Sequence, residues 1–459
     1  MPLAGNGSAS RSVVPGYDVA IIGAGAAGLA AAAVLRHAGL HCILIEAAGR
    51  IGGRAHTVRP AVLGGARFDT GATWLHQTDR NPLVALARAH GIALAPAHQG
   101  PHRLFVGGRP ARPDEVRAYD EARTSWEQIV LGRIDGPDMA LAEAAGSPGF
   151  WTASIENWEG AIIAAADADQ LGLHDWHRNQ LDDNDLSPPD GVGTLLADLL
   201  GPMAGPVQSD TPVRAIDWRD TTWCSLHTAN LSCQARSVIV TVSTGVLRAG
   251  SIAFDPPLPA RTRAAIDGLP MGLLNKLALP ASGLGRLGLD AGTLLESRIM
   301  KRGGSGMLLS AWPSGLPYVS AFYGGRHARS LDGQPQAALA EAHGVLCALL
   351  GPQAGDAVDK AAGFVTDWAS DPLFLGAYAY APPGQAHQRA RLAEPVGDGQ
   401  LVFAGEACRS DGLAGTVGGA LADGERAAHL VLERRFGRNS SPGLLQAHRN
   451  GFPKAPNPV

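Results

Sequence analysis

The feature that most constrains the fold is a glycine-rich turn between a short apolar run and an alanine-rich segment near the N-terminus. Residues 17–22 predict a buried parallel strand, and the motif G-x-G-x-x-G follows directly at 23–28. Residues 26–37 predict a helix and residues 41–45 a second strand. Glu46 stands just after this second strand, 18 residues beyond the last glycine of the motif. This order of strand, helix and strand opens a doubly wound, Rossmann-like sheet that binds a dinucleotide.

The three glycines of the motif have separate physical roles. Gly23 permits a tight turn, Gly25 lets a pyrophosphate approach the backbone, and Gly28 allows close contact between helix and strand. The helix N-terminus, which includes Ala27, adds free N–H groups and a partial positive charge for the phosphates. Glu46 is expected to accept hydrogen bonds from a ribose. The motif alone does not separate NAD from FAD.

Composition narrows the classes of partner. Of the 459 residues, 45% are hydrophobic and 17% are charged, a balance that supports a large core. A net charge of −4 leaves no basic excess for phosphates, so we expect no nucleic-acid partner. No apolar run reaches the ~20 residues that span a bilayer, so we expect no membrane insertion. Five cysteines without a C-x-x-C pair fit a reducing, cytoplasmic location.

Five groups of residues further along the chain resemble motifs of the flavin-containing amine oxidases. The similarity is closest to the polyamine and spermine oxidases, with the monoamine oxidases and lysine-specific histone demethylases as relatives. It runs in matching order over roughly residues 17–434 and is weakest over 81–186. The groups are Glu46–Arg54; Gly71–His76 with Asn81–Leu83; Phe254–Pro259 with Asn275 and Lys276; Trp368–Pro372 with Gly376–Tyr380; and Phe403–Glu406 with Gly415–Val417.

The resemblance implies an α/β fold of two domains, the two-domain flavin amine oxidase fold. One is a split, Rossmann-like FAD-binding domain, and the other is a mixed α+β substrate domain. Apolar runs at 236–242 and 401–404 predict further buried strands, so both ends of the chain contribute to the first domain. We place the FAD-binding domain at 15–80, 187–290 and 395–436, the substrate domain at 81–186 and 291–394, a disordered N-terminus at 1–14 and a C-terminal tail at 437–459.

FAD, which the resemblance implies as cofactor, gives roles to residues outside the first motif. Glu406 is implied at the ribityl or phosphate part, the backbone N–H of Val417 at the isoalloxazine, and the backbone of Val213 at the adenine. Ala377 stands where the monoamine oxidases attach flavin to a cysteine, so the FAD is expected to be non-covalent. The other residues expected at the cofactor are Gly52, Gly53, Arg54, Gly71, Ala72, Thr73, Trp74, Gly405 and Thr416.

Lys276 is one of only four lysines in the chain and lies in the apolar run 273–279. A charge inside such a run is costly unless it has a partner or a pocket. Its ammonium could instead reach solvent from the edge of a strand. By resemblance this lysine approaches the flavin N5 through a water molecule and assists reoxidation by O2, in an electrostatic and proton-handling role.

Three more side chains are implied at the substrate. Trp368 and Tyr378 are compatible with ordinary core positions, whereas the resemblance places them as a wall that faces the flavin and guides a neutral amine. His76 is either a capping or core histidine or, by resemblance, part of the substrate tunnel. The pair His174 and His177 lacks a third ligand, so we expect no metal site.

The activity implied by the resemblance is that of an FAD-dependent amine oxidase. A polyamine or other primary or secondary amine would become an imine, which water hydrolyses, while O2 is reduced to H2O2. The expected partners are therefore a small-molecule amine and molecular oxygen, and the oligomeric state is not predicted. A second amine would need a carboxylate, for which the candidates are the clustered Asp182, Asp183 and Asp185.

Other functions stay open at this point. An L-amino acid oxidase needs a cation for the substrate carboxylate, and this chain has no arginine just past Gly71 and Ala72 before Arg80. A flavin desaturase or protoporphyrinogen-type oxidase is disfavoured because those enzymes lack the lysine and the aromatic wall. A non-catalytic FAD-binding scaffold or demethylase-like partner protein is the remaining alternative, although the sequence shows no separate helical or coiled-coil insert.

Overall fold

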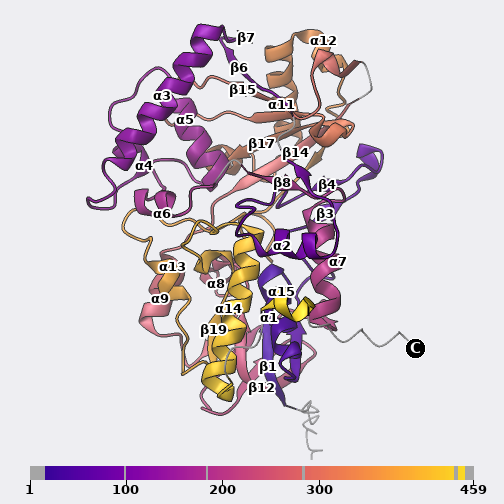
Figure 1. Ribbon diagram of the computed structural model, residues 1–459, viewed down its shortest axis with the longest axis vertical. Helices are drawn as coiled ribbons and strands as arrows, with labels where there is room; N and C mark the ends of the chain where they lie inside the picture. Colours follow the sequence, from indigo (N-terminus) through magenta and orange to yellow (C-terminus); the bar gives the residue numbers. More distant parts are fainter. Residues whose placement is uncertain (1–15, 98–99, 182–183, 282–284, 439–442, 450–459) are drawn as a thin grey trace, which may run out of the picture.

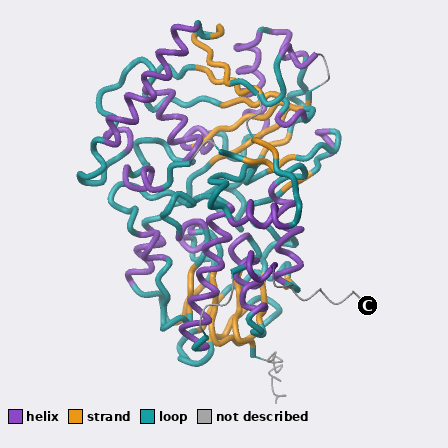
Figure 2. Tube along the Cα trace, in the orientation of Figure 1, coloured by secondary structure: helices purple, strands orange, loops and turns teal. Residues whose placement is uncertain are grey.

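The computed structural model describes residues 16–97, 100–181, 184–281, 285–438 and 443–449. Most strands belong to two large sheets, one toward each end of the long axis in Figure 1. Figure 2 shows helices on the outside of both sheets and long connecting segments between them. The fold is therefore α/β, as the sequence predicts.

The first sheet has a parallel centre, in which β1 (Tyr17–Ile22) lies between β2 (Cys42–Ile45) and β12 (Ser232–Val240). Ile22, the last residue of β1, pairs with Ile45 of β2 and with Val240 of β12. β19 (Leu401–Phe403) also pairs in parallel with β12, so strands from both ends of the chain join one sheet. In sheet order the strands are β13 (Ala253–Asp255), β10 (Ala215–Asp217), β11 (Cys224–His227), β12 (Ser232–Val240), β1 (Tyr17–Ile22), β2 (Cys42–Ile45) and β9 (Val207–Gln208).

Two helices of this half approach each other through small residues. α1 (Ala26–His37) is buried continuously from Ala26 to Leu35, because its alanines let neighbours pack closely on every side. It contacts α14 (Val417–Phe436). At Gly424 of α14, a Cβ atom would lie 2.1 Å from the carbonyl oxygen of Ala27. Only glycine allows this helix contact, which brings α14 against the first turn of α1.

The second sheet is mostly antiparallel. β14 lies inside it, between β17 and β18, with Lys276 of β14 paired to Phe322 of β17. In sheet order the strands are β18 (Phe364–Val365), β14 (Leu274–Pro280), β17 (Tyr318–Gly324), β16 (Leu308–Ala311), β15 (Thr293–Ser297), β6 (His102–Val106) and β7 (Arg109–Pro110).

Two short ladders and the remaining helices complete the fold. The ladders are β3 (Thr57–Val58) with β4 (Phe68–Asp69), and β5 (Ala95–Pro96) with β8 (Leu186–Ser187). The other α-helices are α2 (Pro82–Ala89), α3 (Pro113–Leu131), α4 (Leu141–Ala144), α5 (Thr152–Glu156), α6 (Leu173–Arg178), α7 (Val192–Ala204), α8 (Thr244–Arg248), α9 (Ala260–Asp267), α10 (Gly325–Ser330), α11 (Pro335–Leu350), α12 (Pro352–Asp356), α13 (Gln388–Leu392) and α15 (Leu444–Arg449). The short helical turns are η1 (Ala61–Leu63), the π-helix η2 (Asn157–Ala164), η3 (Gly285–Gly288), η4 (Pro313–Gly315) and η5 (Glu406–Cys408).

Three expected domain boundaries are corrected by these contacts. The segment 187–290 was assigned to the first domain, yet its strand β14 belongs to the second sheet. The segment 81–186 was assigned to the second domain, yet α2 packs in the core around α1. Within 291–394, α13 packs against α9 beside the first sheet. An apolar run predicts burial but does not say which sheet buries it, so the sequence could not place these elements.

The C-terminal tail contains a packed helix that the sequence did not predict. Residues 1–14 and much of the tail 437–459 lie outside the described residues. Within that tail, however, α15 (Leu444–Arg449) packs against the core of α1 through the buried Leu444. The backbone N–H of Leu444 donates to Glu425 at 2.8 Å. One apolar side chain in a polar segment was too weak a signal for this contact.

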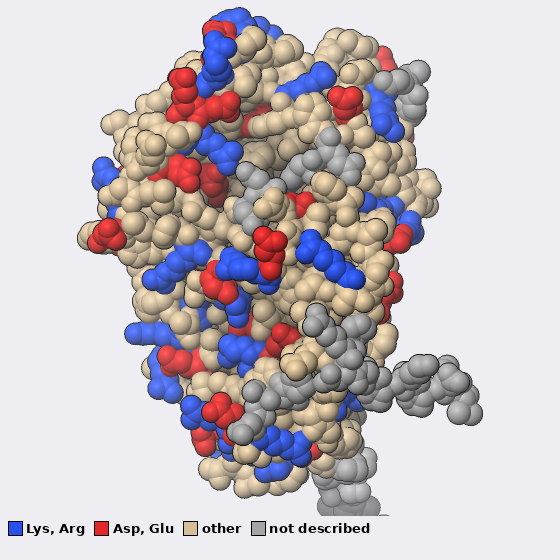
Figure 3. All heavy atoms as spheres, in the orientation of Figure 1, with Lys and Arg blue, Asp and Glu red and all other residues tan. Residues whose placement is uncertain are grey.

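Three further properties follow from the described residues. Basic and acidic side chains are intermixed over the face in Figure 3. Among the helices described, none combines the length and the apolar character needed to cross a bilayer. Nor do the described residues contain a group of three histidine, cysteine or acidic side chains arranged to hold a metal ion.

Candidate active site

A cavity of about 1140 Å³ is lined by residues from both sheets. Among the residues that the structure describes, Gly28 is the one predicted at the cofactor or the substrate that does not line it. The predicted residues at its wall are Gly23, Gly25, Ala27, Glu46, Gly52, Gly53, Arg54, Gly71, Ala72, Thr73, Trp74, His76, Val213, Lys276, Trp368, Tyr378, Gly405, Glu406, Thr416 and Val417.

The glycine turn forms one end of this cavity. Gly23 has φ of +101°, and a Cβ on Gly28 would lie 1.8 Å from the Gly23 carbonyl oxygen, so neither position accepts a side chain. Gly25 lies against a second glycine pair, Gly52 and Gly53. A Cβ on Gly53 would be 3.2 Å from the Cα of Gly25. The hydroxyl of Thr241, a residue that no sequence motif singled out, donates to the Gly23 carbonyl at 3.1 Å. The result is bare backbone facing the cavity, as a pyrophosphate requires.

Glu46 lies at the end of β2 with its carboxylate against the turn. One oxygen accepts the backbone N–H of Ala24 at 2.6 Å and the other accepts that of Ala48 at 2.8 Å. Both bonds fix the carboxylate at the cavity wall. This is the position at which an acidic residue recognises a ribose in dinucleotide sites.

Arg54 and Glu406 form a buried polar junction at the same cavity. Arg54 donates to Glu406 Oε1 at 2.8 Å and to the carbonyl of Ala377 at 2.8 Å. The backbone N–H of Ala379 donates to the same carboxylate oxygen at 3.0 Å. Among the described residues, Glu406 Oε2 has no hydrogen-bond partner although it is buried. An unpartnered carboxylate oxygen at the cavity fits a donor such as a cofactor hydroxyl.

The N-terminus of α14 opens onto the cavity. Thr416 caps the helix, since its hydroxyl oxygen accepts the N–H of Gly419 at 2.9 Å and its hydroxyl donates to Leu413 at 2.7 Å. Val417 is therefore the first residue of the helix, with a backbone N–H that the helix itself does not use. The helix dipole places partial positive charge at this point.

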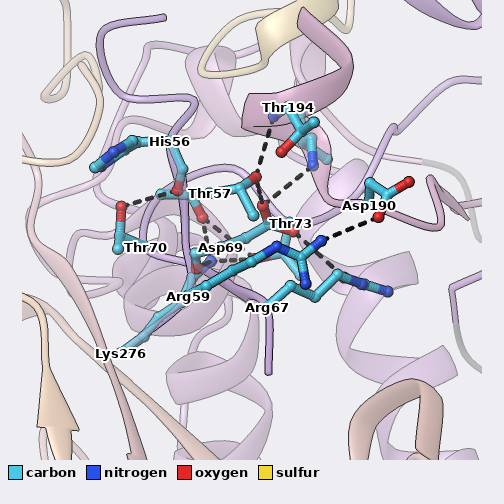
Figure 4. A network of polar contacts seen from close by, with 12 residues as sticks. His56, Thr57, Arg59, Arg67, Asp69, Thr70, Thr73, Asp190, Thr194 and Lys276 are labelled. Atoms are coloured by element: carbon cyan, nitrogen blue, oxygen red, sulfur yellow. Dashed lines mark hydrogen bonds and ion pairs between the residues drawn. The ribbon is translucent and has the colours of Figure 1, made fainter. Parts of the chain in front are cut away.

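Lys276 extends from β14 toward the loop 69–73, as Figure 4 shows. Its ammonium donates to the carbonyls of Asp69 at 3.3 Å and of Gly71, and to the hydroxyl of Thr73. The side chain is buried inside the sheet rather than snorkelling to solvent, so the alternative of an exposed strand edge is wrong. Burial lowers the pKa of Lys276 to about 8, and the Asp69 carboxylate opposes that shift.

The loop 69–73, which accepts the hydrogen bonds of Lys276, is itself held by contacts with other segments. Asp69 accepts hydrogen bonds from the Thr57 hydroxyl and from the N–H of Val192 at 3.1 Å. Burial raises the pKa of this carboxyl group. A Cβ on Gly71 would lie 1.7 Å from the carbonyl oxygen of Arg54, so the backbone at Gly71 has no room to move toward it. The sequence did not predict Thr57 and Asp69 at this site, because no motif relates them to Lys276.

Trp368 and Tyr378 are held at the cavity by hydrogen bonds of their polar atoms. The Trp368 indole N–H donates to the carbonyl of Thr70 at 3.1 Å, and its ring packs edge-on against Phe374 at 5.1 Å. The Tyr378 hydroxyl donates to the carbonyl of Ile163 at 2.8 Å, and burial raises its pKa. Their position at the cavity agrees with the sequence expectation, while their role toward an amine stays a prediction.

His76 also lines the cavity, and its Nδ1 lies 2.7 Å from a carboxylate oxygen of Asp185. Asp185, one of the three candidate carboxylates for a second amine, is the partner of this histidine. The other two acids of that cluster, Asp182 and Asp183, lie outside the described residues.

A further carboxylate at the cavity, that of Glu159, was missed by sequence reasoning. Glu159 lies in the π-helix η2 and accepts the indole N–H of Trp176 at 3.1 Å. Arg123 of α3 donates to its other oxygen at 3.5 Å. Burial raises the pKa of Glu159. The π-helix is a rare form found often at functional sites, and its period differs from the one used to read helices from sequence.

A buried ion pair lies at the cavity wall. Arg389 donates to Asp175 of α6 at 2.6 and 2.9 Å, and both side chains are almost fully buried. Arg389 also donates to the carbonyls of Ala379 at 2.9 Å and Ala407 at 3.2 Å. These two residues directly follow Tyr378 and Glu406, so the pair holds the backbone beside both. Asp175 and Arg389 are 214 residues apart in the chain, so sequence motifs could not predict their pairing.

A split dinucleotide-binding sheet that shares one cavity with a buried lysine and an aromatic wall defines the class of dinucleotide-dependent enzymes. The family comparison agrees with this class. Residues 26–432 match the family described as "Flavin containing amine oxidoreductase". The chain belongs to this family.

Relatives of two kinds are similar over most of the chain. Protein FLOWERING LOCUS D of Arabidopsis thaliana is 31% identical, over 92% of this chain and 57% of its own length. Lysine-specific histone demethylase 1 homolog 2 of Oryza sativa subsp. japonica is 28% identical, over 92% of this chain and 58% of its own. Probable polyamine oxidase 4 of Arabidopsis thaliana is 28% identical, over 85% of this chain and 82% of its own. The chain thus spans little more than half of the first two relatives.

Solved structures of putrescine oxidase have the same fold. The wild-type protein bound to putrescine superposes with a TM-score of 0.72 and covers 92% of this chain and 100% of its own. The sequence identity is 22%, so this likeness shows the fold.

Proposed function

We propose that this protein is an FAD-dependent amine oxidase that acts on a diamine or polyamine and uses O2 as acceptor, with release of H2O2. The observation that carries this proposal is the meeting of a dinucleotide cradle, a buried lysine and an aromatic wall in one cavity. Its relatives among polyamine oxidases support the class of substrate.

The cavity wall fits FAD at four places. The bare turn at Gly23 and Gly25 suits a pyrophosphate, and Glu46 suits the adenosine ribose. The unpartnered oxygen of Glu406 suits a hydroxyl donor of the ribityl chain, and the N-terminus of α14 at Val417 suits the electron-rich end of the ring system. When bound, FAD supplies the hydride acceptor and the centre that reacts with O2.

We infer that the cofactor is held without a covalent bond. Ala377 offers only a methyl group at the position where the monoamine oxidases attach flavin to a cysteine. Its carbonyl is occupied by Arg54, which fixes the backbone at this point. The five cysteines are Cys42, Cys224, Cys233, Cys347 and Cys408, and none of them lines the cavity.

Lys276 is the group that handles a proton at the centre of the cavity. With a pKa of about 8, its amine is accessible in both protonation states near neutral pH. Its three donors are matched by the three oxygens of Asp69, Gly71 and Thr73, which favour the charged form against burial. A water molecule can approach the amine when one of these three bonds is exchanged.

The aromatic wall orients the substrate and excludes water. Trp368 and Tyr378 have their polar atoms tied to backbone carbonyls, so they present aromatic surface at the cavity. An ammonium group is poorly solvated there, and the reacting nitrogen enters as a neutral amine with its lone pair free. Fixed aromatic planes also limit the orientations of the reacting carbon.

The carboxylate of Glu159 supports a substrate with a second amine. It lines the cavity together with the indoles of Trp126, Trp158 and Trp176, which attract cations through their π-faces. A distal ammonium at Glu159 would replace a buried, weakly paired charge by a close ion pair. We therefore propose Glu159 as the carboxylate for the second amine, in place of the cluster Asp182, Asp183 and Asp185 expected from the sequence.

A second candidate, L-amino acid oxidation, is favoured by one observation. Arg123 lines the cavity and supplies a cation that could bind a substrate carboxylate. It is directed at Glu159, however, so its charge is already compensated. Diamine oxidation therefore remains the function that the site supports best.

The experiment is a peroxide-release assay on purified, FAD-loaded protein with matched substrates. Putrescine and butylamine have the same carbon chain and differ in the second amine; spermidine, spermine, L-leucine and a methylated lysine peptide complete the set. We expect the highest kcat/KM for putrescine or a polyamine. Peroxide from L-leucine alone, from the peptide alone, or from none of the compounds would contradict the proposal.

A further inference from the structure

His76 and Asp185 face each other across a short antiparallel bridge. Leu75 and Leu186 exchange both backbone hydrogen bonds, at 2.8 and 3.1 Å. In an antiparallel pair the next residue on one side stands opposite the previous residue on the other, so His76 faces Asp185. The pairing register therefore brings together two side chains that are 109 residues apart in the chain.

The backbones of both residues are held from outside the pair. The carbonyl of His76 accepts the side-chain amide N–H of Asn81 at 2.8 Å, and Asn81 itself caps α2. The carbonyl of Asp185 accepts the N–H of Ala97 at 2.9 Å, beside the ladder of β5 and β8. The backbones of His76 and Asp185 are thus fixed by other hydrogen bonds. The 2.7 Å contact between the side chains is not required to hold them in place.

The contact decides which ring nitrogen of His76 carries the proton. A carboxylate accepts hydrogen bonds, so the nitrogen that faces Asp185, Nδ1, is the protonated one. In the neutral ring the other nitrogen, Nε2, then bears a free lone pair. Both side chains are mostly buried, at 19% and 8% exposed, and both line the cavity with Lys276 and the aromatic wall.

We propose that Asp185 is a positioning residue that holds His76 with its proton on Nδ1, so that Nε2 accepts the proton of the substrate ammonium. This inference rests on the proposed amine oxidation. In the step, the N–H bond of the ammonium breaks, a bond forms between that proton and Nε2, and the amine nitrogen keeps the electron pair. The substrate becomes the neutral amine that the aromatic wall admits, and the ring becomes an imidazolium beside the Asp185 carboxylate.

The first test reads the tautomer directly and does not depend on turnover. FAD-loaded protein labelled with ¹⁵N in histidine gives separate signals for protonated and unprotonated ring nitrogens, and the spectrum of His76→Gln identifies those of His76. We expect Nδ1 protonated and Nε2 unprotonated in the native protein. In Asp185→Asn, whose amide can donate to Nδ1, we expect the proton on Nε2. A protonated Nε2 in the native protein, or an unchanged tautomer in the variant, would overturn the proposal.

The second test is kinetic, with putrescine as substrate. Loss of a proton acceptor predicts a fall in kcat/KM of about 100-fold in His76→Gln and of about ten-fold or more in Asp185→Asn. The double variant should be no slower than His76→Gln, because Asp185 acts through the histidine. Asp185→Glu should recover part of the activity. Asp190→Asn is the matched control, since Asp190 is an exposed acid three residues past β8 that pairs with Arg59.

The outcomes separate this inference from the function on which it rests. Full additivity of the two losses, or native activity in Asp185→Asn, would refute the positioning role while the oxidase function stands. A native protein that oxidises no amine in the panel refutes the function itself, whatever the tautomer. A purely structural pair would lower the melting temperature of Asp185→Asn and Asp185→Glu alike without restoring activity in the latter, which also counts against the proposal.

Discussion

Arg54 and Glu406 are 352 residues apart in the chain, and their side chains meet in a hydrogen-bonded ion pair of 2.8 Å at the cavity wall. Arg54 follows the second glycine pair, and Glu406 follows β19. The pair therefore joins the two terminal parts of the chain at the point where the unpartnered Glu406 oxygen faces the cavity. A buried carboxylate with one oxygen free is costly unless a ligand completes it.

The first prediction concerns FAD affinity. Glu406→Gln keeps the shape of the side chain and removes its charge, so it weakens both the Arg54 contact and the hydrogen bond to a cofactor hydroxyl. Hydrogen bonds to charged groups contribute about 1.5–3 kcal/mol, which corresponds to a rise in the dissociation constant for FAD of about 10- to 100-fold. Fluorescence titration of the apoprotein with FAD measures it. Asp398→Asn, an exposed carboxylate, is the control, and equal affinity in all three proteins would disprove the role of Glu406.

The second prediction concerns the attachment of FAD. Because Ala377 has no nucleophilic side chain, acid or heat denaturation should release all of the flavin into the supernatant. The absorbance of supernatant and pellet after precipitation measures the two fractions. Flavin that remains with the precipitated protein would show that the bond is covalent.

The third prediction concerns the contribution of Lys276 to the rate at which the reduced enzyme reacts with O2. Lys276→Met preserves the length of the side chain and removes the buried proton-handling amine. We expect the substrate-reduced enzyme to react with O2 about 100-fold more slowly, in the range found when a preorganised electrostatic group is deleted. Anaerobic reduction with putrescine, followed by stopped-flow mixing with O2, measures this rate. Lys301→Met, at an exposed lysine, is the control, and an unchanged rate in Lys276→Met would make Lys276 structural.

The fourth prediction uses the ionisation of the same lysine. Its pKa is about 8 in the folded protein against 10.5 as the ordinary value, so folding favours the neutral amine. Below pH 8 the folded state bears the cost of a buried charge, and this cost disappears as pH rises from about 8 to about 10.5, to a total of about 3 kcal/mol. The melting temperature of the native protein relative to Lys276→Met should therefore rise between pH 7 and pH 9.5. A constant difference would contradict the lowered pKa.

The fifth prediction concerns the second amine of the substrate. Glu159→Gln should raise KM for putrescine about ten-fold and leave KM for butylamine within about two-fold, because a charge-assisted hydrogen bond contributes ~1.5 kcal/mol or more. Arg123→Gln should lower KM for putrescine, since it removes a cation that competes for Glu159. Glu121→Gln, at an exposed acid of α3, is the control. Equal effects on the two amines would rule out a distal ammonium at Glu159.

The sequence by itself determined the dinucleotide half of the site. The turn at Gly23 and Gly28 follows from local sterics, because a φ of +101° and a carbonyl 1.8 Å from the place of a Cβ leave no choice of residue. Glu46 at the end of β2 follows from its position in that element, and Val417 at the start of α14 follows from the resemblance of its motif to the flavin-containing amine oxidases. The rare lysine at 276 was visible because a charge stood in an apolar run. All of these signals lie within a few residues of the group that they predict.

Only the tertiary structure decided the substrate half. Whether β14 belongs to the first or the second sheet depends on its pairing with β17, which no local pattern encodes. His76 meets Asp185 through a backbone register between distant segments, and Glu159 reaches the cavity through a π-helix whose period differs from that of an α-helix. Strand pairing and the contacts between elements depend on the packing of the whole chain. Local backbone geometry therefore determines the residues of the cofactor site, whereas long-range packing determines which side chains face the substrate.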